Sequence, residues 1–163
     1  MISAINAFSF DRCSQVGVKL LQEQQVQTHQ SLTQLASINH YLESLLLTRP
    51  PLILGLGVHS RSNKQIYLET QATNRFRGRL LGSASQVKTV TLPNFLPQVS
   101  PLQLSTHLGT SYCNYISWQL CQLIISQLPD TRYTFLHLPK NLPPTTLYQQ
   151  IQPIIAGFIQ TNS

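Results

Sequence analysis

Apolar residues recur at helical spacing in the first third of the chain. Between residues 14 and 47 they follow one another at steps of three and four, which places them on one stripe of a helix. Two prolines, Pro50 and Pro51, follow and cannot continue a helix, so two helices are predicted before residue 50. The glutamine-rich run LLQEQQVQTHQSLTQ shares the Leu and Val spacing and favours an exposed helix. The stripe consists of Val16, Leu20, Leu21, Leu32, Leu35, Ile38, Leu42, Leu45 and Leu46.

A different pattern, short and unbroken, appears in PLILGLGV at residues 51–58. Such a run is typical of a strand buried on both faces of a parallel sheet. Further strands are predicted in QIYLETQA, over residues 87–92 and in RYTFLHLP. A helix is predicted over residues 114–128, and a final helix, interrupted by its proline, in TTLYQQIQPIIAGFI. Helices and strands in this order predict an α/β fold, and 163 residues without a repeat or linker predict one domain over residues 1–163.

The positive net charge makes nucleic-acid binding a further possible function. The formal net charge is +6 because the chain has only five acidic residues. Most positive charges are scattered, but RFRGR brings Arg75, Arg77 and Arg79 together around Phe76. Cations beside an aromatic ring are found on nucleic-acid-binding surfaces, so a basic nucleic-acid-binding module stays open as an alternative.

The spacing of the cysteines and histidines gives no sign of a metal site. Cys13, Cys113 and Cys121 form no CxxC pair, and none of them has metal-ligand spacing to a histidine, so neither a metal nor a cofactor is expected. The N-terminal stretch MISAINAFSF lacks the basic region of a secretory signal, and no apolar run is long enough for a bilayer. Free thiols in the reducing cytoplasm are therefore predicted.

Cys113 stands between a Gly-Thr-Ser turn and a predicted helix. Backbone N–H groups and the helix dipole at a helix start stabilise an anion, so this position favours a thiolate with a lowered pKa. Thr110 or Ser111 is the expected capping residue. The alternative is a small buried cysteine that only packs the helix start, as expected for Cys13 and Cys121.

Two further residues could complete a catalytic group. His137 lies near the carboxyl end of a predicted core strand, where open α/β sheets bind ligands, and could serve as a base. Glu69 follows the strand QIYL and could accept the second imidazole N–H, as in catalytic triads generally. We expect the three residues on one sheet edge. The alternatives are a structural histidine and a glutamate paired with a nearby arginine. No G-x-S-x-G elbow, P-loop or dinucleotide fingerprint is present.

These residues resemble the motifs of one family. GTSYCN at residues 109–114 is similar to the cysteine motif of the pyroglutamyl peptidase I family, also called pyrrolidone carboxyl peptidases. TFLHLP at residues 134–139 resembles the strand that ends in the family's histidine, with the family's spacing from the cysteine. ETQATNRFRGR resembles the family's Glu-Arg-x-Ala-x-Asn run, on which Glu69, Ala72, Asn74 and Arg79 fall.

The resemblance implies a three-layer α/β/α sandwich with a mostly parallel open sheet. It also implies a cytoplasmic cysteine exopeptidase that removes N-terminal pyroglutamate from peptides, without a cofactor. Cys113 would be the nucleophile, His137 the base and Glu69 the residue that orients the base. Arg79 would support the oxyanion region, and Leu80 and Tyr112 match positions that line the substrate pocket. Assembly into homo-oligomers is implied as well.

The N-terminal part departs from the family pattern. Family members open with a strand that leads into Gly-Phe-x-Pro-Phe, whose aromatic side chains grip the substrate ring. Here the chain reads MISAINAFSFDR, so the first family strand is expected to be largely missing, with Phe8 and Phe10 as the only candidates for the aromatics. A degenerate member that binds capped peptide N-termini without turnover therefore stays open as a second alternative.

Overall fold

The computed structural model describes residues 4–83 and 87–162 and is built around a six-stranded sheet. The strand order is β2-β1-β3-β10-β4-β9. Neighbouring strands are parallel except for β10 and β4, so β4 and β9 run opposite to the other four. The strand bounds are Ile5–Phe10 for β1, Thr28–Leu32 for β2, Leu52–His59 for β3, Ile66–Glu69 for β4, Leu102–Ser105 for β9 and Arg132–Pro139 for β10.

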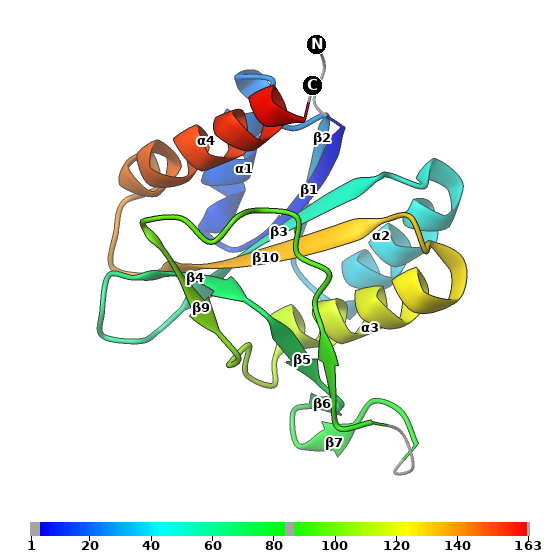
Figure 1. Ribbon diagram of the computed structural model, residues 1–163. Coiled ribbons are helices and arrows are strands. Elements are labelled where there is room, and N and C mark those ends of the chain that lie inside the picture. The colour runs from blue at the N-terminus through cyan, green and yellow to red at the C-terminus, as the bar shows by residue number, and fades with distance from the viewer. Residues whose placement is uncertain (1–3, 84–86, 163) are drawn as a thin grey trace.

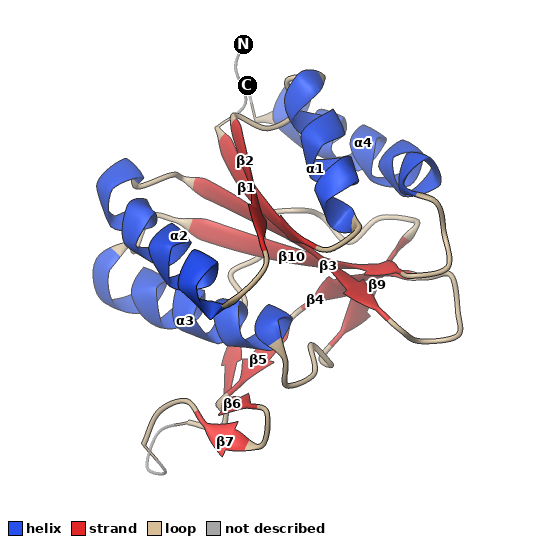
Figure 2. Cartoon of the chain, turned by 180° about the vertical axis from the view of Figure 1, so that it is seen from behind, coloured by secondary structure: helices blue, strands red, loops and turns tan. Residues whose placement is uncertain are grey.

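Helices cover both faces of this sheet. Helices α1 (Cys13–Gln22) and α4 (Pro144–Thr161) lie on one face, and α2 (Leu35–Thr48) and α3 (Tyr112–Gln127) lie on the other, as Figure 1 and Figure 2 show. The predicted three-layer α/β/α sandwich with a mostly parallel sheet is therefore confirmed.

Two apolar cores follow from the alternation of side chains along the strands. On β10, Leu136 and Leu138 pack with residues of α1 and α4, whereas Tyr133 and Phe135 pack with residues of α2 and α3. His137 has the same parity as Tyr133 and Phe135, so its side chain lies on the α2–α3 face.

A small lobe extends from the sheet beside the start of α3. Strand β5 (Gln71–Thr73) pairs with β8 (Thr89–Thr91), and β6 (Arg75–Phe76) forms a hairpin with β7 (Arg79–Leu80). The hairpin projects at the bottom of Figure 1. Its connection to the main body includes a backbone hydrogen bond of 2.8 Å from the N–H of Arg77 to the carbonyl oxygen of Thr110.

Several sequence-based expectations were wrong. The first strand is not largely missing, because β1 occupies residues 5–10 and pairs with two neighbours. Residues 28–32 form the edge strand β2 rather than helix, since pairing with β1 satisfies their backbone groups. Helix α4 is continuous through Pro153, because its apolar face packs on the sheet on both sides of that residue. Strand β9 and the β6–β7 hairpin were not anticipated.

Two general findings bear on the function class. No helix within residues 4–83 and 87–162 is long and apolar enough to cross a membrane. The same residues contain no group of three or more His, Cys, Asp or Glu side chains arranged to hold a metal ion.

Candidate active site

A buried pair, His137 and Glu69, lies at the centre of the site. His137 Nδ1 is 2.9 Å from Glu69 Oε1, and the glutamate is fully buried. A carboxylate accepts hydrogen bonds, so Nδ1 carries the proton and Nε2 is left as the basic nitrogen. In the antiparallel register Glu69 is aligned with Phe135, and it reaches His137 diagonally on the same face. The two side chains thus meet through strand pairing, not because β4 and β10 end at one edge as expected.

The thiol of Cys113 lies on the same face of the sheet. Gly57 on β3 is the register partner of His137 on β10, and a β-carbon built on Gly57 would be 2.7 Å from Cys113 Sγ. The sulfur is therefore above the sheet at the position next to His137. Cys113 is the second residue of α3, so the start of this helix positions the thiol on the side of the sheet where His137 lies.

Local hydrogen bonds fix the start of α3. Gly109 has a φ of 81°, which favours glycine, and Ser111 takes the N-cap position without a side-chain capping bond. Asn114 is fully buried and bonds to the backbone of the small lobe: its Oδ1 accepts from the N–H of Thr73, and its Nδ2 donates to the carbonyl oxygens of Thr73 and Arg75. The first N–H groups of α3 have no carbonyl partner one turn earlier, so they are available to an anion.

The surroundings of Cys113 favour the neutral thiol. Burial raises the pKa of Cys113 to about 12, and the carboxylates of Asp11 and Glu69 act in the same direction, against a backbone hydrogen bond that lowers it. This direction is opposite to the lowered pKa that the helix start led us to expect. A thiol in such surroundings would need a neighbouring base to act as a nucleophile.

A guanidinium does lie beside the buried glutamate, but it is that of Arg61 and not that of Arg79. Arg61 Nη2 is 3.7 Å from Glu69 Oε1 and also donates to Ser105 Oγ and to the carbonyl oxygen of His107. Its guanidinium carbon lies 4.1 Å from the centroid of the Tyr67 ring. These contacts hold a positive charge against the carboxylate that pairs with His137.

A second histidine, His59, lies next to His137. The two ring centroids are 5.9 Å apart, and His59 Nε2 lies 2.7 Å from the carbonyl oxygen of Gln65, to which it donates. Burial lowers the pKa of His59, and the nearby His137 adds to this effect. His59 is thus a neutral neighbour of the candidate base.

The predicted substrate-binding residues fall into different environments. Phe8 is fully buried among Tyr41, Tyr133 and Phe135, so it is a core residue and the expectation that it grips a ligand is wrong. Phe10 is 5% exposed and stacks on the half-buried Tyr112 at 6.4 Å between centroids, beside the helix start.

The other predicted positions lie in the hairpin. Leu80 is half exposed and lines a cavity beside the site, whereas Arg79 is exposed and makes no side-chain hydrogen bond or ion pair with the described residues. Arg75 is also exposed, and the guanidinium of Arg77 lies about 5 Å from the rings of Phe76 and Tyr112.

Gly57, His59 and Arg61 are the site residues that the sequence did not reveal. All three lie on β3 or on the polar loop HSRSNK that follows it. A polar loop after a buried parallel strand is a signal for a ligand-binding edge, and it could have indicated His59 and Arg61.

Neither a protein-family model nor a curated protein sequence matches the chain. Solved structures do match it over nearly its whole length. Pyroglutamyl peptidase I from Bacillus amyloliquefaciens superposes with a TM-score of 0.79 at 16% identity, over 98% of this chain and 95% of that chain. The chain has the fold of the pyroglutamyl peptidases.

Two further structures agree with this. Pyrrolidone carboxyl peptidase from Thermococcus litoralis has a TM-score of 0.74 at 15% identity, with 96% of this chain and 93% of that chain covered. The pyrrolidone carboxyl peptidase from Thermus thermophilus has a TM-score of 0.67 at 18% identity, with 93% and 98% covered. The likeness to this fold therefore includes the N-terminal part that the sequence suggested was reduced.

Proposed function

We propose that the chain is a cysteine exopeptidase that removes N-terminal pyroglutamate from peptides, with Cys113, His137 and Glu69 as its catalytic group. The observation that carries the proposal is the buried His137–Glu69 pair on the same face as the Cys113 thiol. The pyroglutamyl peptidase fold supports the choice of substrate. We infer that residues 1–163 form one peptidase domain, and the three free cysteines favour a reducing compartment such as the cytoplasm.

The first half-reaction begins with a neutral thiol. His137 Nε2 takes the proton from Cys113 Sγ as the sulfur attacks the carbonyl carbon that joins pyroglutamate to the next residue. Glu69 holds Nδ1–H and stabilises the imidazolium that forms. The oxygen that becomes negative is stabilised by the free N–H groups at the start of α3.

Loss of the amine completes this first half-reaction, and hydrolysis of the thioester then restores the thiol. The tetrahedral intermediate expels the amine of the shortened peptide, which takes the proton from His137 Nε2 and leaves a pyroglutamyl thioester on Cys113. Water then gives a proton to the same nitrogen and attacks the thioester carbon. When the carbon–sulfur bond breaks, pyroglutamate leaves and the proton returns to sulfur.

The neutral ring of the substrate needs an apolar surface. Phe10 and Tyr112 provide one, since their stacked rings lie at the carboxyl end of β1 and at the residue before the nucleophile. Phe76 extends the surface, with its ring centroid 5.7 Å from that of Tyr112. Phe10 and Tyr112 keep the role that the sequence had assigned to them, and Phe76 is added in place of Phe8.

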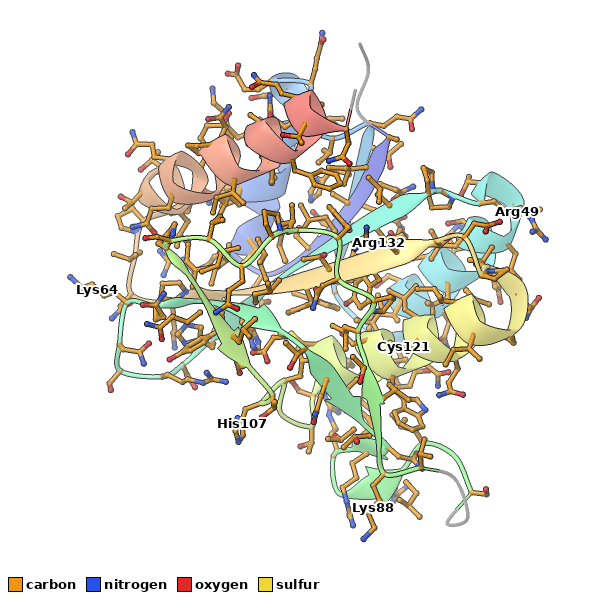
Figure 3. All side chains as sticks on the ribbon, in the orientation of Figure 1. Arg49, Lys64, Lys88, His107, Cys121 and Arg132 are labelled. Carbon is orange, nitrogen blue, oxygen red and sulfur yellow. The ribbon has the colours of Figure 1, made fainter. Side chains whose placement is uncertain are left out.

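Hydrolysis of a fluorogenic pyroglutamyl amide tests the proposal. The Cys113→Ala variant is compared with Cys121→Ala, which removes a second buried cysteine from the same helix and leaves the site intact. Figure 3 labels Cys121, which lies further along α3. Turnover that disappears in the first variant and persists in the second is the expected result.

Three outcomes contradict the proposal in different ways. Equal turnover in the Cys113→Ala variant and in wild type would show that Cys113 is not the nucleophile. No turnover in a folded wild-type protein that still binds a pyroglutamyl peptide would favour the non-cleaving relative. Salt-sensitive binding of nucleic acid that survives Cys113→Ala, without any hydrolysis, would favour the basic module around Arg75, Arg77 and Arg79.

A further inference from the structure

A cavity of about 690 Å³ opens beside the candidate active site. One wall is the loop that precedes α3, at residues 108–110, and the opposite wall is formed by residues 73–75 of the small lobe. Arg61 and Lys88 also line it. The cavity is large enough for one or two amino-acid residues.

Direct contacts connect this cavity with the catalytic group. Arg61 lines the cavity and lies 3.7 Å from Glu69 Oε1. Asn114, the residue after Cys113, bonds to the backbone of Thr73 and Arg75 in the cavity wall. A peptide whose carbonyl group is at Cys113 would therefore reach this cavity with a neighbouring residue.

The charge of the cavity has one sign. Its lining includes Arg61, Arg75, Lys88 and His107 and contains no aspartate or glutamate. Arg75 and Lys88 are exposed, and neither forms a salt bridge within the described residues. Unpaired cations in a concave site attract an anion, because low-dielectric walls concentrate their field. Figure 3 shows Lys88 and His107 on the same side of the molecule, toward the small lobe.

The sheet order separates Phe10, at one end of the aromatic surface, from Glu69, beside which the cavity-lining Arg61 lies. Phe10 ends β1, which lies on one side of β3, whereas Glu69 ends β4, on the opposite side beyond β10. Cys113 Sγ lies over Gly57 of β3, between the two. The uncharged ring fits the aromatic side, so the residue on the leaving side of the scissile bond falls on the cationic side.

We propose that this cavity binds the residue that follows pyroglutamate and selects a carboxylate there. The inference rests on the proposed peptidase function and adds its substrate class: pyroglutamyl peptides whose second residue is acidic or carries the free C-terminal carboxylate. Arginine and lysine would bind either carboxylate through charge-assisted hydrogen bonds. Arg75 and Lys88 are specificity residues in this scheme and take no part in the bond-breaking steps.

The test compares peptides that differ only in charge. Pyroglutamyl-glutamate amide, pyroglutamyl-glutamine amide and pyroglutamyl-lysine amide are hydrolysed under the same conditions at low salt. We expect kcat/KM for the glutamate peptide to be roughly tenfold above that for its neutral isostere. Pyroglutamyl-glutamine with a free C-terminus distinguishes the two carboxylate sources: a gain over its amide assigns the site to the terminal carboxylate, and no gain assigns it to the side chain.

Charge reversal supplies the decisive variant. Arg75→Glu combined with Lys88→Glu should turn the preference toward the lysine peptide, so that kcat/KM for the lysine amide exceeds kcat/KM for the glutamate amide. A matched control combines Arg49→Glu with Lys64→Glu, which makes the same change in net charge at exposed positions outside the cavity lining; Figure 3 shows both residues away from Lys88. Equal rates for the three wild-type substrates, or a preference that follows net charge in the control, would overturn the inference.

The carboxylate selectivity of the cavity can be tested even if the protein is not a peptidase. If a folded protein cleaves none of the peptides, the proposed function fails, and binding to the Cys113→Ala variant is measured by calorimetry with the glutamate and glutamine peptides. Tighter binding of the glutamate peptide that disappears with Arg75→Glu and Lys88→Glu would uphold the carboxylate site. Equal affinities would refute it.

Discussion

The thiol of Cys113 lies directly above Gly57, so close that a β-carbon on that glycine would come within 2.7 Å of Sγ. The same β-carbon would meet the Phe135 ring at 2.6 Å. Glycine at this position is therefore what allows the sulfur to approach the sheet beside His137. The approach of the Cys113 thiol to His137 across β3 therefore depends on the absence of a side chain at position 57.

Gly57→Ala should displace the thiol and reduce activity. The added methyl group must push Cys113 or Phe135 away, which costs about 1–3 kcal/mol in a packed core. A displacement of about 1 Å from the reacting geometry lowers kcat roughly a hundredfold. Pyroglutamyl amide hydrolysis and urea unfolding of the variant measure the two effects.

Gly157→Ala is the matched control for that variant. Gly157 lies in α4 and a β-carbon there meets nothing within 4 Å, so alanine should stabilise the helix by about 0.5–1 kcal/mol without a change in activity. A stable and fully active Gly57→Ala protein would show that the sulfur does not need its position above β3.

Glu69→Gln should show how much activity depends on the carboxylate that orients His137, because the histidine itself stays in place. The amide has the shape of the carboxylate but no charge to stabilise the imidazolium, and its NH₂ group can favour the wrong tautomer. We expect kcat to fall by about 10²–10⁴ with little change in KM. Glu43→Gln, at an exposed position on α2, is the control and should leave both parameters unchanged. Wild-type kcat in the Glu69→Gln variant would exclude the carboxylate from the mechanism.

Asn114→Asp should destabilise the junction between α3 and the small lobe. Aspartate keeps an oxygen for the N–H of Thr73 but places a second oxygen against the carbonyl oxygens of Thr73 and Arg75, which are now bonded to Nδ2. Two lost hydrogen bonds and a buried unpaired oxygen should cost about 3 kcal/mol or more. Urea unfolding measures this cost, and Asn141→Asp, at an exposed position, should change stability by less than about 0.5 kcal/mol.

The buried thiols predict a loss of stability in alkali. Burial raises the pKa of Cys121 from 9.0 to about 12, and burial also raises the pKa values of Cys113 and Cys13. Above about pH 9 the unfolded chain loses thiol protons that the folded chain keeps, so the free energy of unfolding falls as the pH rises. The contribution of each thiol is fully present below pH 9 and declines by up to about 1.4 kcal/mol per pH unit above it.

Urea titrations between pH 8 and 10.5 measure that slope. Cys121→Ala removes one thiol, so its slope above pH 9 should be shallower than that of wild type, whatever its absolute stability. An identical slope would mean that Cys121 ionises equally in the folded and unfolded chains.

The sequence predicted the fully buried strands β3 and β10 and missed the polar edge strand β2 for physical reasons. Strands β3 and β10 are buried on both faces, so each appears as a continuous apolar run. Strand β2 has the polar sequence THQSL at the sheet edge, and only its pairing with β1 shows that it is a strand. The bounds of α3 differed by two residues at its start, because Tyr112 and Cys113 complete its first turn.

Motif spacing located Cys113, His137 and Glu69, and the structure places them on one face. It did not locate Arg61 or Gly57, because their contacts with Glu69 and Cys113 depend on strand register and not on distance along the chain. The assignment of Phe8 to a ligand failed for a different reason. Phe8 and Phe10 lie on the same face of β1, but the rings of Tyr41, Tyr133 and Phe135 cover Phe8, whereas Phe10 ends the strand beside Tyr112, and these tertiary contacts cannot be read from the sequence.

Strand β10 is inserted between β3 and β4, although it is made long after both. His137 and Glu69 are separated by 68 positions, so Glu69 gains its His137 partner only after most of the chain has been synthesised. Pairings between such distant segments carry a high entropic cost of loop closure and slow the folding of a domain. On the proposed mechanism, hydrolysis therefore cannot begin before β10 has paired with β3 and β4.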